Sequence, residues 1–350
     1  MDSSCFPKPV NGDEKCHDED DPLVVVASYN RFDNLAHEPK GSASDKNTLR
    51  VFRLHRSSAT LTLLAVDDTL GNPAFLRFHP EYNVLYACTE DITKDNQVAC
   101  FAVSPNCGKL TYLESQSAMG KSTCYLEIDI PRKHMMFVNY WDSVVGTMPL
   151  SESGIIMPVN QKLKPEREVV ARDLKDHLAN RQSEPHAHAV VLDPYFGKVA
   201  FIPDLGMDVI RQLHYDEGTG LLSPSTTISC GPDDLKPHGP RYMFVLVSNR
   251  GHNSIAVFAI RKATTCGEAG YLRIVKYCHT KGKTPRHFQF DPSGQFLLSA
   301  NQDTDSITIF KFNTVTGDLT FTGDVSDVPS PNFVCVFQPH RNHRRNNARL

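Results

Sequence analysis

Residues 284–301 read TPRHFQFDPSGQFLLSAN, and variants of this phrase recur along the chain at intervals of roughly fifty residues. Each copy begins with a small residue or Pro-Arg, continues through an apolar strand and an Asp-Pro or His-Pro turn, and ends in a second apolar strand closed by Ser/Ala-Asn. A third strand follows at 306–312, and residues 316–319 lead into a fourth. Four short strands in each repeat, without helical spacing between them, indicate the blades of a β-propeller. The sequence therefore predicts an all-β fold.

The two ends of the repeat region complement each other. Residues 330–339 restate the first strand of a blade, whereas the chain enters the repeats at 24–30 with the character of a second strand. We expect these two segments to pair, because a C-terminal strand beside an N-terminal one closes the ring and protects two sheet edges.

One repeat is too short. In the second and last repeats, 16 residues separate the opening proline from the end of the second strand, from Pro73 to Thr89 and from Pro285 to Asn301. Only nine residues separate Pro240 from Asn249, which is too few for a strand and its turn. We therefore expect about one blade to be missing and six blades to be recognisable.

The rest of the chain divides around the propeller. Residues 1–22 are polar and acidic and are predicted to be a disordered leader, and 23–339 form the propeller. Residues 158–184 break the rhythm and are interpreted as a loop insertion, with a possible short amphipathic helix around Val169 to Leu178. The basic segment 340–350 is predicted to be a disordered tail.

Composition excludes several classes of protein. The balance of 37 Lys+Arg against 40 Asp+Glu gives no indication of a nucleic-acid partner. No stretch approaches the ~20 apolar residues of a membrane helix, so we expect no membrane partner. The N-terminus lacks the apolar region of a signal peptide. Ten cysteines occur without CxxC pairs, so free thiols and a cytoplasmic location are expected.

Three phrases give a family resemblance: His186-Ala187-His188, Gly239-Pro240-Arg241 and Thr284-Pro285-Arg286, together with the SNRGHNS of 248–254. With these the chain resembles, over roughly 23–339, the cytosolic lactonase family of seven-bladed β-propellers. That family includes propeller-type 6-phosphogluconolactonases and the fungal carboxymuconate lactonizing enzyme. The resemblance implies seven blades in relatives, and hence the loss of one here.

The resemblance also implies a site. In that family a His, two Arg and a carboxylate from separate blades meet at one mouth of the propeller. His188 matches the His, Arg241 the first Arg, and Arg286 the second. The family's Glu, in a Val-Asn-Glu phrase after Gly-Pro-Arg, has no counterpart, since Arg241 runs almost directly into the next blade.

These residue types suit lactone chemistry. A His near neutral pKa can move a proton to or from a ring oxygen or water, and Arg forks can hold carboxylate or phosphate and stabilise an oxyanion. His188 is predicted to be the acid/base and Arg241 and Arg286 the anion clamps. His186, His238 and Arg250 are secondary candidates for substrate binding. His186 and His188 have no plausible third metal ligand, so no metal and no cofactor are expected.

The sequence thus predicts a lactonase-like hydrolase of a small anionic sugar lactone such as 6-phosphogluconolactone. Two alternatives stay open: a catalytically impaired propeller that serves as a binding platform, and a lactonizing cyclase of the carboxymuconate type. The expected partner in each case is a small anionic lactone or carboxylate. The sequence does not indicate an oligomeric state.

Overall fold

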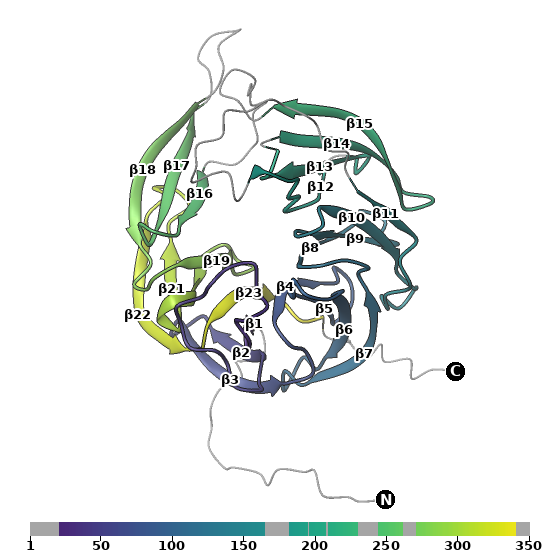
Figure 1. The fold of residues 1–350 in the computed structure, drawn as a ribbon. Helices are drawn as coiled ribbons and strands as arrows, with labels where there is room; N and C mark the ends of the chain where they lie inside the picture. Colours follow the sequence, from purple (N-terminus) through teal and green to yellow (C-terminus); the bar gives the residue numbers. More distant parts are fainter. Residues whose placement is uncertain are drawn as a thin grey trace, which may run out of the picture.

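Short antiparallel strands joined by turns make up most of the chain, and they are arranged as sheets around a centre (Figure 1). The structure is a computed structural model that describes residues 21–164, 182–194, 196–207, 209–229, 244–261 and 271–340. Within these residues the strands form six antiparallel sheets, five of four strands and one of three.

The bounds of the strands follow the order of the sheets. The first sheet contains β23 (Pro331–Phe337), β1 (Leu23–Ser28), β2 (Leu49–His55) and β3 (Thr60–Asp67). The second contains β4 (Pro73–Phe78), β5 (Val84–Thr89), β6 (Gln97–Val103) and β7 (Leu110–Ser117). The third contains β8 (Thr123–Ile128), β9 (His134–Asn139), β10 (Val144–Pro149) and β11 (Gln161–Leu163).

The remaining sheets complete the set. The fourth contains β12 (Val191–Leu192), β13 (Val199–Asp204), β14 (Val209–Asp216) and β15 (Leu221–Ser229). The fifth contains β16 (Phe244–Asn249), β17 (Ser254–Arg261) and β18 (Tyr271–His279). The sixth contains β19 (Pro285–Phe290), β20 (Phe296–Asn301), β21 (Ser306–Phe312) and β22 (Leu319–Asp327). A short 3₁₀ helix, Gln302–Thr304, links β20 to β21.

The predicted all-β architecture of antiparallel sheets is confirmed. The described residues form the six expected sheets, and β23 pairs with β1, with Leu23 opposite Phe337 and Val25 opposite Cys335. One boundary differs from the prediction: the segment interpreted as a loop insertion begins with a strand, β11, which pairs with β10 and completes the third sheet. The possible helix around Val169 to Leu178 lies outside the described residues.

Strand β1 shows how the sheets pack. Its residues are all buried, and they alternate between two clusters: Val25 packs towards the second sheet and Val24 towards the sixth. Because side chains of a strand point alternately to its two faces, a strand covered on both faces reads as a continuous apolar run. Burial of this kind stabilises the fold by about 25 cal/mol for each Å² of apolar surface.

The clusters also reveal where the ring is incomplete. Among the described residues, five apolar clusters join neighbouring sheets, and they run from the fifth sheet through the sixth, first, second and third to the fourth. No such cluster within the described part of the chain joins the fourth sheet to the fifth. The shortened repeat predicted from Pro240 to Asn249 falls in this interval.

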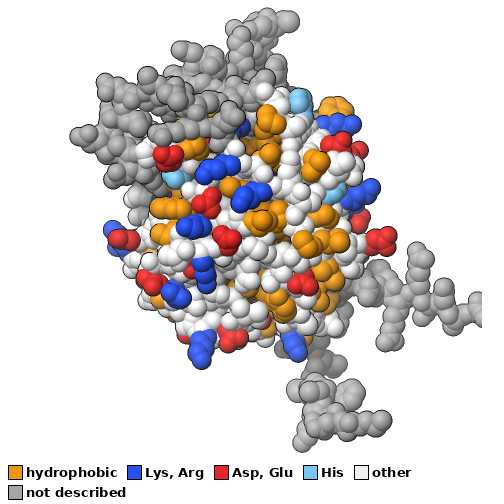
Figure 2. All heavy atoms as spheres, turned by 45° about the vertical axis from the view of Figure 1, so that its right-hand side comes forward, with side chains coloured by type: hydrophobic (Ala, Val, Ile, Leu, Met, Phe, Trp, Pro, Cys, Tyr) orange, Lys and Arg blue, Asp and Glu red, His pale blue; other side chains and the backbone are white. Residues whose placement is uncertain are grey.

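The surface is mixed in charge. Figure 2 shows Lys and Arg side chains interspersed with Asp and Glu over the face that it presents. Within the described residues, no helix has both the length and the apolar character needed to cross a membrane.

Candidate functional site

A pocket of about 720 Å³ lies among the innermost strands. Its size falls within the range of small-molecule sites, which is roughly 300–1,000 Å³. Its walls combine apolar side chains, such as Phe75 and Phe333, with ionisable ones. The ionisable residues and polar groups that carry the argument below are His37, Glu90, His188, Arg250, Arg286 and Asn332.

A shared β-bulge explains how the inner strands reach this pocket. In β4, β8, β19 and β23 the pairing register with the next strand skips the second residue. The skipped residues are Ala74 in β4, Cys124 in β8, Arg286 in β19 and Asn332 in β23. All four line the pocket. A bulge bends its strand and re-aims the extra side chain, so the Arg of the Thr-Pro-Arg phrase is directed into the ligand space by the backbone itself.

His188 lies just before β12. Its backbone N–H donates to the carbonyl of Pro203 at 3.0 Å, and its ring meets the ring of Tyr140 edge-on at 5.4 Å. The side chain is exposed to the open pocket while protein surrounds the pocket on its other sides. Two effects lower the pKa of His188: the larger is this partial desolvation, and the next is the positive charge of Arg286. The imidazole is therefore neutral at neutral pH.

Arg286 belongs to a compact polar group that we call the Arg286 cluster, formed by Arg286, His37, Tyr29 and Glu90. Nη1 of Arg286 lies 2.7 Å from Nε2 of His37, and Nη2 donates to the hydroxyl of Tyr29 at 3.2 Å. The Tyr29 hydroxyl in turn donates to Glu90. Burial raises the pKa of Tyr29 well above its usual value, which keeps this proton on the phenol.

Glu90 is a site residue that the sequence analysis missed. It is 4% exposed, follows directly after β5, and has its Oε2 3.9 Å from Nη2 of Arg286. The resemblance implied a carboxylate after Arg241, which this sequence lacks, and Glu90 supplies a carboxylate from another sheet. A signal was present: a carboxylate, Glu90, follows directly after Thr89, which ends β5 as Asn139 and Asn301 end β9 and β20.

His37 was also missed, because it lies in the long loop between β1 and β2. It lines the pocket, and burial together with the charge of Arg286 lowers its pKa to about 4. Nothing in the polar run from 31 to 48 distinguishes this histidine in the sequence, since only the fold brings the loop over the pocket.

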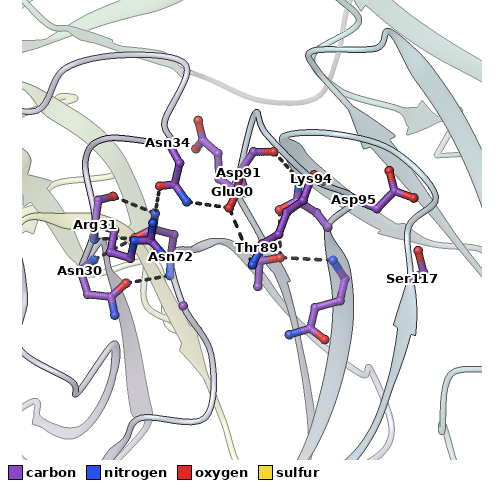
Figure 3. A pocket seen from close by; sticks show the side chains of 13 residues that line it. Asn30, Arg31, Asn34, Asn72, Thr89, Glu90, Asp91, Lys94, Asp95 and Ser117 are labelled. Atoms are coloured by element: carbon purple, nitrogen blue, oxygen red, sulfur yellow. Dashed lines mark hydrogen bonds and ion pairs between the residues drawn. The ribbon is translucent and has the colours of Figure 1, made fainter.

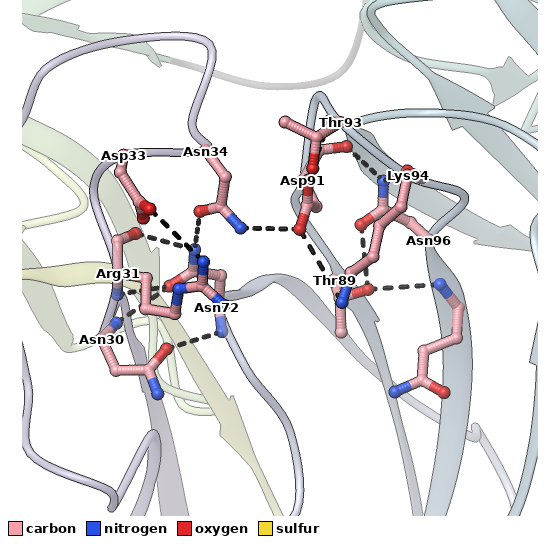
Figure 4. A network of polar contacts seen from close by, with 11 residues as sticks. Asn30, Arg31, Asp33, Asn34, Asn72, Thr89, Asp91, Thr93, Lys94 and Asn96 are labelled. Atoms are coloured by element: carbon pink, nitrogen blue, oxygen red, sulfur yellow. Dashed lines mark hydrogen bonds and ion pairs between the residues drawn. The ribbon is translucent and has the colours of Figure 1, made fainter.

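A second, smaller pocket of about 360 Å³ adjoins Glu90 and is lined almost entirely by polar residues (Figure 3). Across it runs a hydrogen-bond network, which Figure 4 shows, between the loop after β1 and the turn after β5. The Nδ2 of Asn72 donates to the carbonyl of Arg31 at 2.7 Å and to Oδ1 of Asn34 at 2.9 Å. Asn34 then donates to Asp91 at 2.6 Å. The network ties the loop that carries His37 to the turn that carries Glu90.

The structure places some of the predicted site residues and not others. His188, Arg250 and Arg286 line one pocket. His186 is not among its lining residues: its ring stacks on Tyr140 at 4.8 Å, and its Nδ1 lies 3.2 Å from the Tyr140 carbonyl. Arg241 and His238 lie outside the described residues, so their roles stay predictions. Within the described part of the chain, no group of three His, Cys, Asp or Glu side chains is placed to hold a metal ion.

Comparisons with known proteins agree with this architecture. Residues 24–243 and 234–336 match the family described as lactonase, 7-bladed beta-propeller. The chain therefore belongs to the lactonase family of seven-bladed β-propellers, as the resemblance implied. The match comes in two segments that overlap at 234–243, around Pro240, where the short spacing indicates the missing blade.

Individual relatives are similar over most of their length. A 6-phosphogluconolactonase from Bacillus subtilis is 27% identical over 331 residues, covering 81% of this chain and 92% of the relative. A 6-phosphogluconolactonase from Formosa agariphila is 25% identical over 341 residues, covering 80% and 93%. The solved structure of a periplasmic gluconolactonase from Pseudomonas aeruginosa has a TM-score of 0.69 at 20% identity and covers 90% of this chain and 98% of its own, which shows a shared fold.

Proposed function

We propose that this protein hydrolyses a small anionic sugar lactone such as 6-phosphogluconolactone. The observation that carries the proposal is a histidine with a lowered pKa, His188, in the same pocket as the two cationic side chains Arg286 and Arg250. The names of the relatives support the substrate class. A pocket that offers a base and positive charge suits an electrophilic carbonyl on an anionic molecule.

The proposed reaction adds water across the ring ester. Neutral His188 accepts a proton from a water molecule as the water oxygen attacks the lactone carbonyl carbon. The tetrahedral intermediate then collapses, the bond between the carbonyl carbon and the ring oxygen breaks, and the ring oxygen takes the proton back from His188. The product is an open-chain hydroxy acid, whose carboxyl group releases one proton at neutral pH.

The arginines act on negative charge. Arg286, held by the Arg286 cluster, is positioned to stabilise the oxyanion of the intermediate or the anionic group of the substrate. Arg250 lines the same pocket and supplies further positive charge. Arg241 is proposed as a second clamp on the strength of its Gly-Pro-Arg phrase, and His186 and His238 as contributors to substrate binding.

The test is an assay of 6-phosphogluconolactone hydrolysis. The reaction is monitored through the proton that it releases, and the rate is corrected for spontaneous opening of the lactone. The variants His188→Ala and Arg286→Ala are expected to lower kcat/KM at least about tenfold each, a loss of about 1.4 kcal/mol in transition-state stabilisation. His214→Ala and Arg273→Ala, which change exposed residues on β14 and β18, serve as matched controls and retain activity.

Two results would count against the proposal. A folded, monodisperse chain that binds 6-phosphogluconate without opening the lactone would favour the binding platform. Equal activity of the wild type and the His188→Ala variant would remove His188 from the mechanism.

A further inference from the structure

The imidazole of His37 has a defined tautomer because of its partner. Nε2 of His37 lies 2.7 Å from Nη1 of Arg286, and a guanidinium can only donate. Nε2 must therefore be the acceptor, and in the neutral ring the proton sits on Nδ1. That atom faces Glu90, whose Oε1 lies 3.9 Å away.

The backbone around His37 is tied to the same cluster. The N–H of Ala36 donates to Oε1 of Glu90 at 3.3 Å, and the N–H of Ser44 donates to the carbonyl of Tyr29 at 2.8 Å. Upstream, Asn34 is held by Asp91 and Asn72. The imidazole is therefore presented to Arg286 by a loop anchored on both sides.

A neutral acceptor has an electrostatic advantage at this place. A carboxylate in direct contact with Arg286 would orient the guanidinium but would also cancel much of its charge towards an anionic ligand. Here the carboxylate of Glu90 is 3.9 Å from Nη2, and the closer acceptors are the imidazole of His37 and the phenol of Tyr29. The direct hydrogen bonds of the guanidinium thus go to uncharged groups, and Glu90 forms a longer ion pair with it.

We propose that His37 is a positioning residue that orients Arg286 for an anionic ligand. This rests on the proposed function in that it concerns the same pocket and the same class of ligand. The low pKa of His37, about 4, supports it, because a protonated ring could not accept from Arg286.

The first experiment reads the tautomer without any substrate. Protein labelled with ¹⁵N-histidine, assigned with the His37→Gln variant, is expected to show His37 at pH 7 as the neutral tautomer with its proton on Nδ1. Arg286→Ala is expected to alter this signal. A proton on Nε2 in the wild type would overturn the proposal, because Arg286 could not then donate to that atom.

The second experiment separates positioning from packing. Calorimetric titration with 6-phosphogluconate is expected to give about a tenfold weaker Kd for His37→Leu, about 1.4 kcal/mol, since the acceptor for the charged guanidinium is lost. His37→Gln, whose amide oxygen can accept from Arg286, is expected to stay within about threefold of the wild type. His214→Leu, on an exposed face of β14, is the control for the substitution itself.

The outcomes test the role of His37 separately from the proposed hydrolysis. Equal losses in His37→Leu and His37→Gln, or no loss in either, would show that acceptance from Arg286 is not what His37 contributes. If the wild type binds 6-phosphogluconate but opens no lactone, the proposed hydrolysis fails while the role of His37 is still decided by Kd. If no binding is seen, the tautomer decides it alone.

Discussion

His188 and Arg286 interact electrostatically through the pocket that they share. Desolvation and then the charge of Arg286 lower the pKa of His188. A general base acts in its neutral form, so activity falls as the pH drops through the pKa of the base. The lowered pKa places this loss below the ordinary value for histidine, about 6.5, and keeps the base available at neutral pH.

Removing the charge of Arg286 should change the pH at which activity is lost on the acidic side. In Arg286→Gln, loss of the neighbouring cation is expected to raise the pKa of His188, so the acidic limb of kcat/KM shifts to higher pH even as the overall rate falls. The limb is measured from pH–rate profiles, and the His188 ring can be titrated by NMR in both proteins. A profile that falls in rate without any shift would mean that Arg286 does not act on His188.

The site could be predicted from the sequence only in part at this scale. His188, Arg250 and Arg286 stand in recognisable phrases, and the structure brings them to one pocket. The sequence analysis missed Glu90 and His37, for different reasons. Glu90 follows directly after Thr89, which stands where β9 and β20 end in Asn, and this is a local signal. His37, in contrast, depends on the path of a loop that no local pattern specifies.

At the level of the secondary-structure elements, β23 connects several sheets. It pairs with β1 along its length and places Phe333 in the cluster shared with the second sheet and Val334 in the cluster shared with the sixth. Its Asn332 donates to the carbonyl of Pro73 at 2.8 Å, which links it to β4. One strand thus joins three sheets.

Truncation should show how much depends on β23. A chain ending at Ser330 is expected to be aggregated or unfolded, because β1 loses one of its two partner strands and becomes a sheet edge, and two apolar clusters lose residues. A chain ending at His340, whose backbone exchanges hydrogen bonds with the side chain of Asn83, keeps every described contact and is the control. Light scattering and circular dichroism compare the two; a monodisperse, folded product ending at Ser330 would refute the closing role of β23.

The strands themselves were largely predictable, and their bulges were not. The pairing of β23 with β1 follows from complementary strand types at the two ends of the repeats. The bulges at Arg286 and Asn332 leave no mark in the sequence beyond the proline before Arg286 and before Asn332, and that proline also occurs in ordinary turns. Similarly, β11 is only three residues long, which is too short for an alternation of apolar and polar residues to be recognised.

For the molecule as a whole, the clusters between sheets define an uneven ring. Strand β16 is the edge of its described sheet and is only partly buried, whereas β5, β9 and β20 are flanked by a strand on each side and are buried throughout. Local stability follows the density of buried apolar contacts. The fifth sheet should therefore open more readily than the second, third and sixth.

Hydrogen exchange tests this expectation strand by strand. Amides of β16 are expected to exchange faster than those of β5, β9 and β20 under native conditions, with the protection of these three close to that of global unfolding. The three fully buried strands serve as internal controls in the same sample. Uniform protection across β16 and the other three would mean that the ring is equally stable at every sheet.

The place of Asn332 and Phe333 in the pocket wall also bears on synthesis of the protein. These residues belong to the last described strand, so the ribosome makes them after His37, Glu90, His188 and Arg286 have already emerged. The pocket acquires this part of its wall only when β23 pairs with β1. A chain released before β23 is therefore expected to lack this part of the pocket wall.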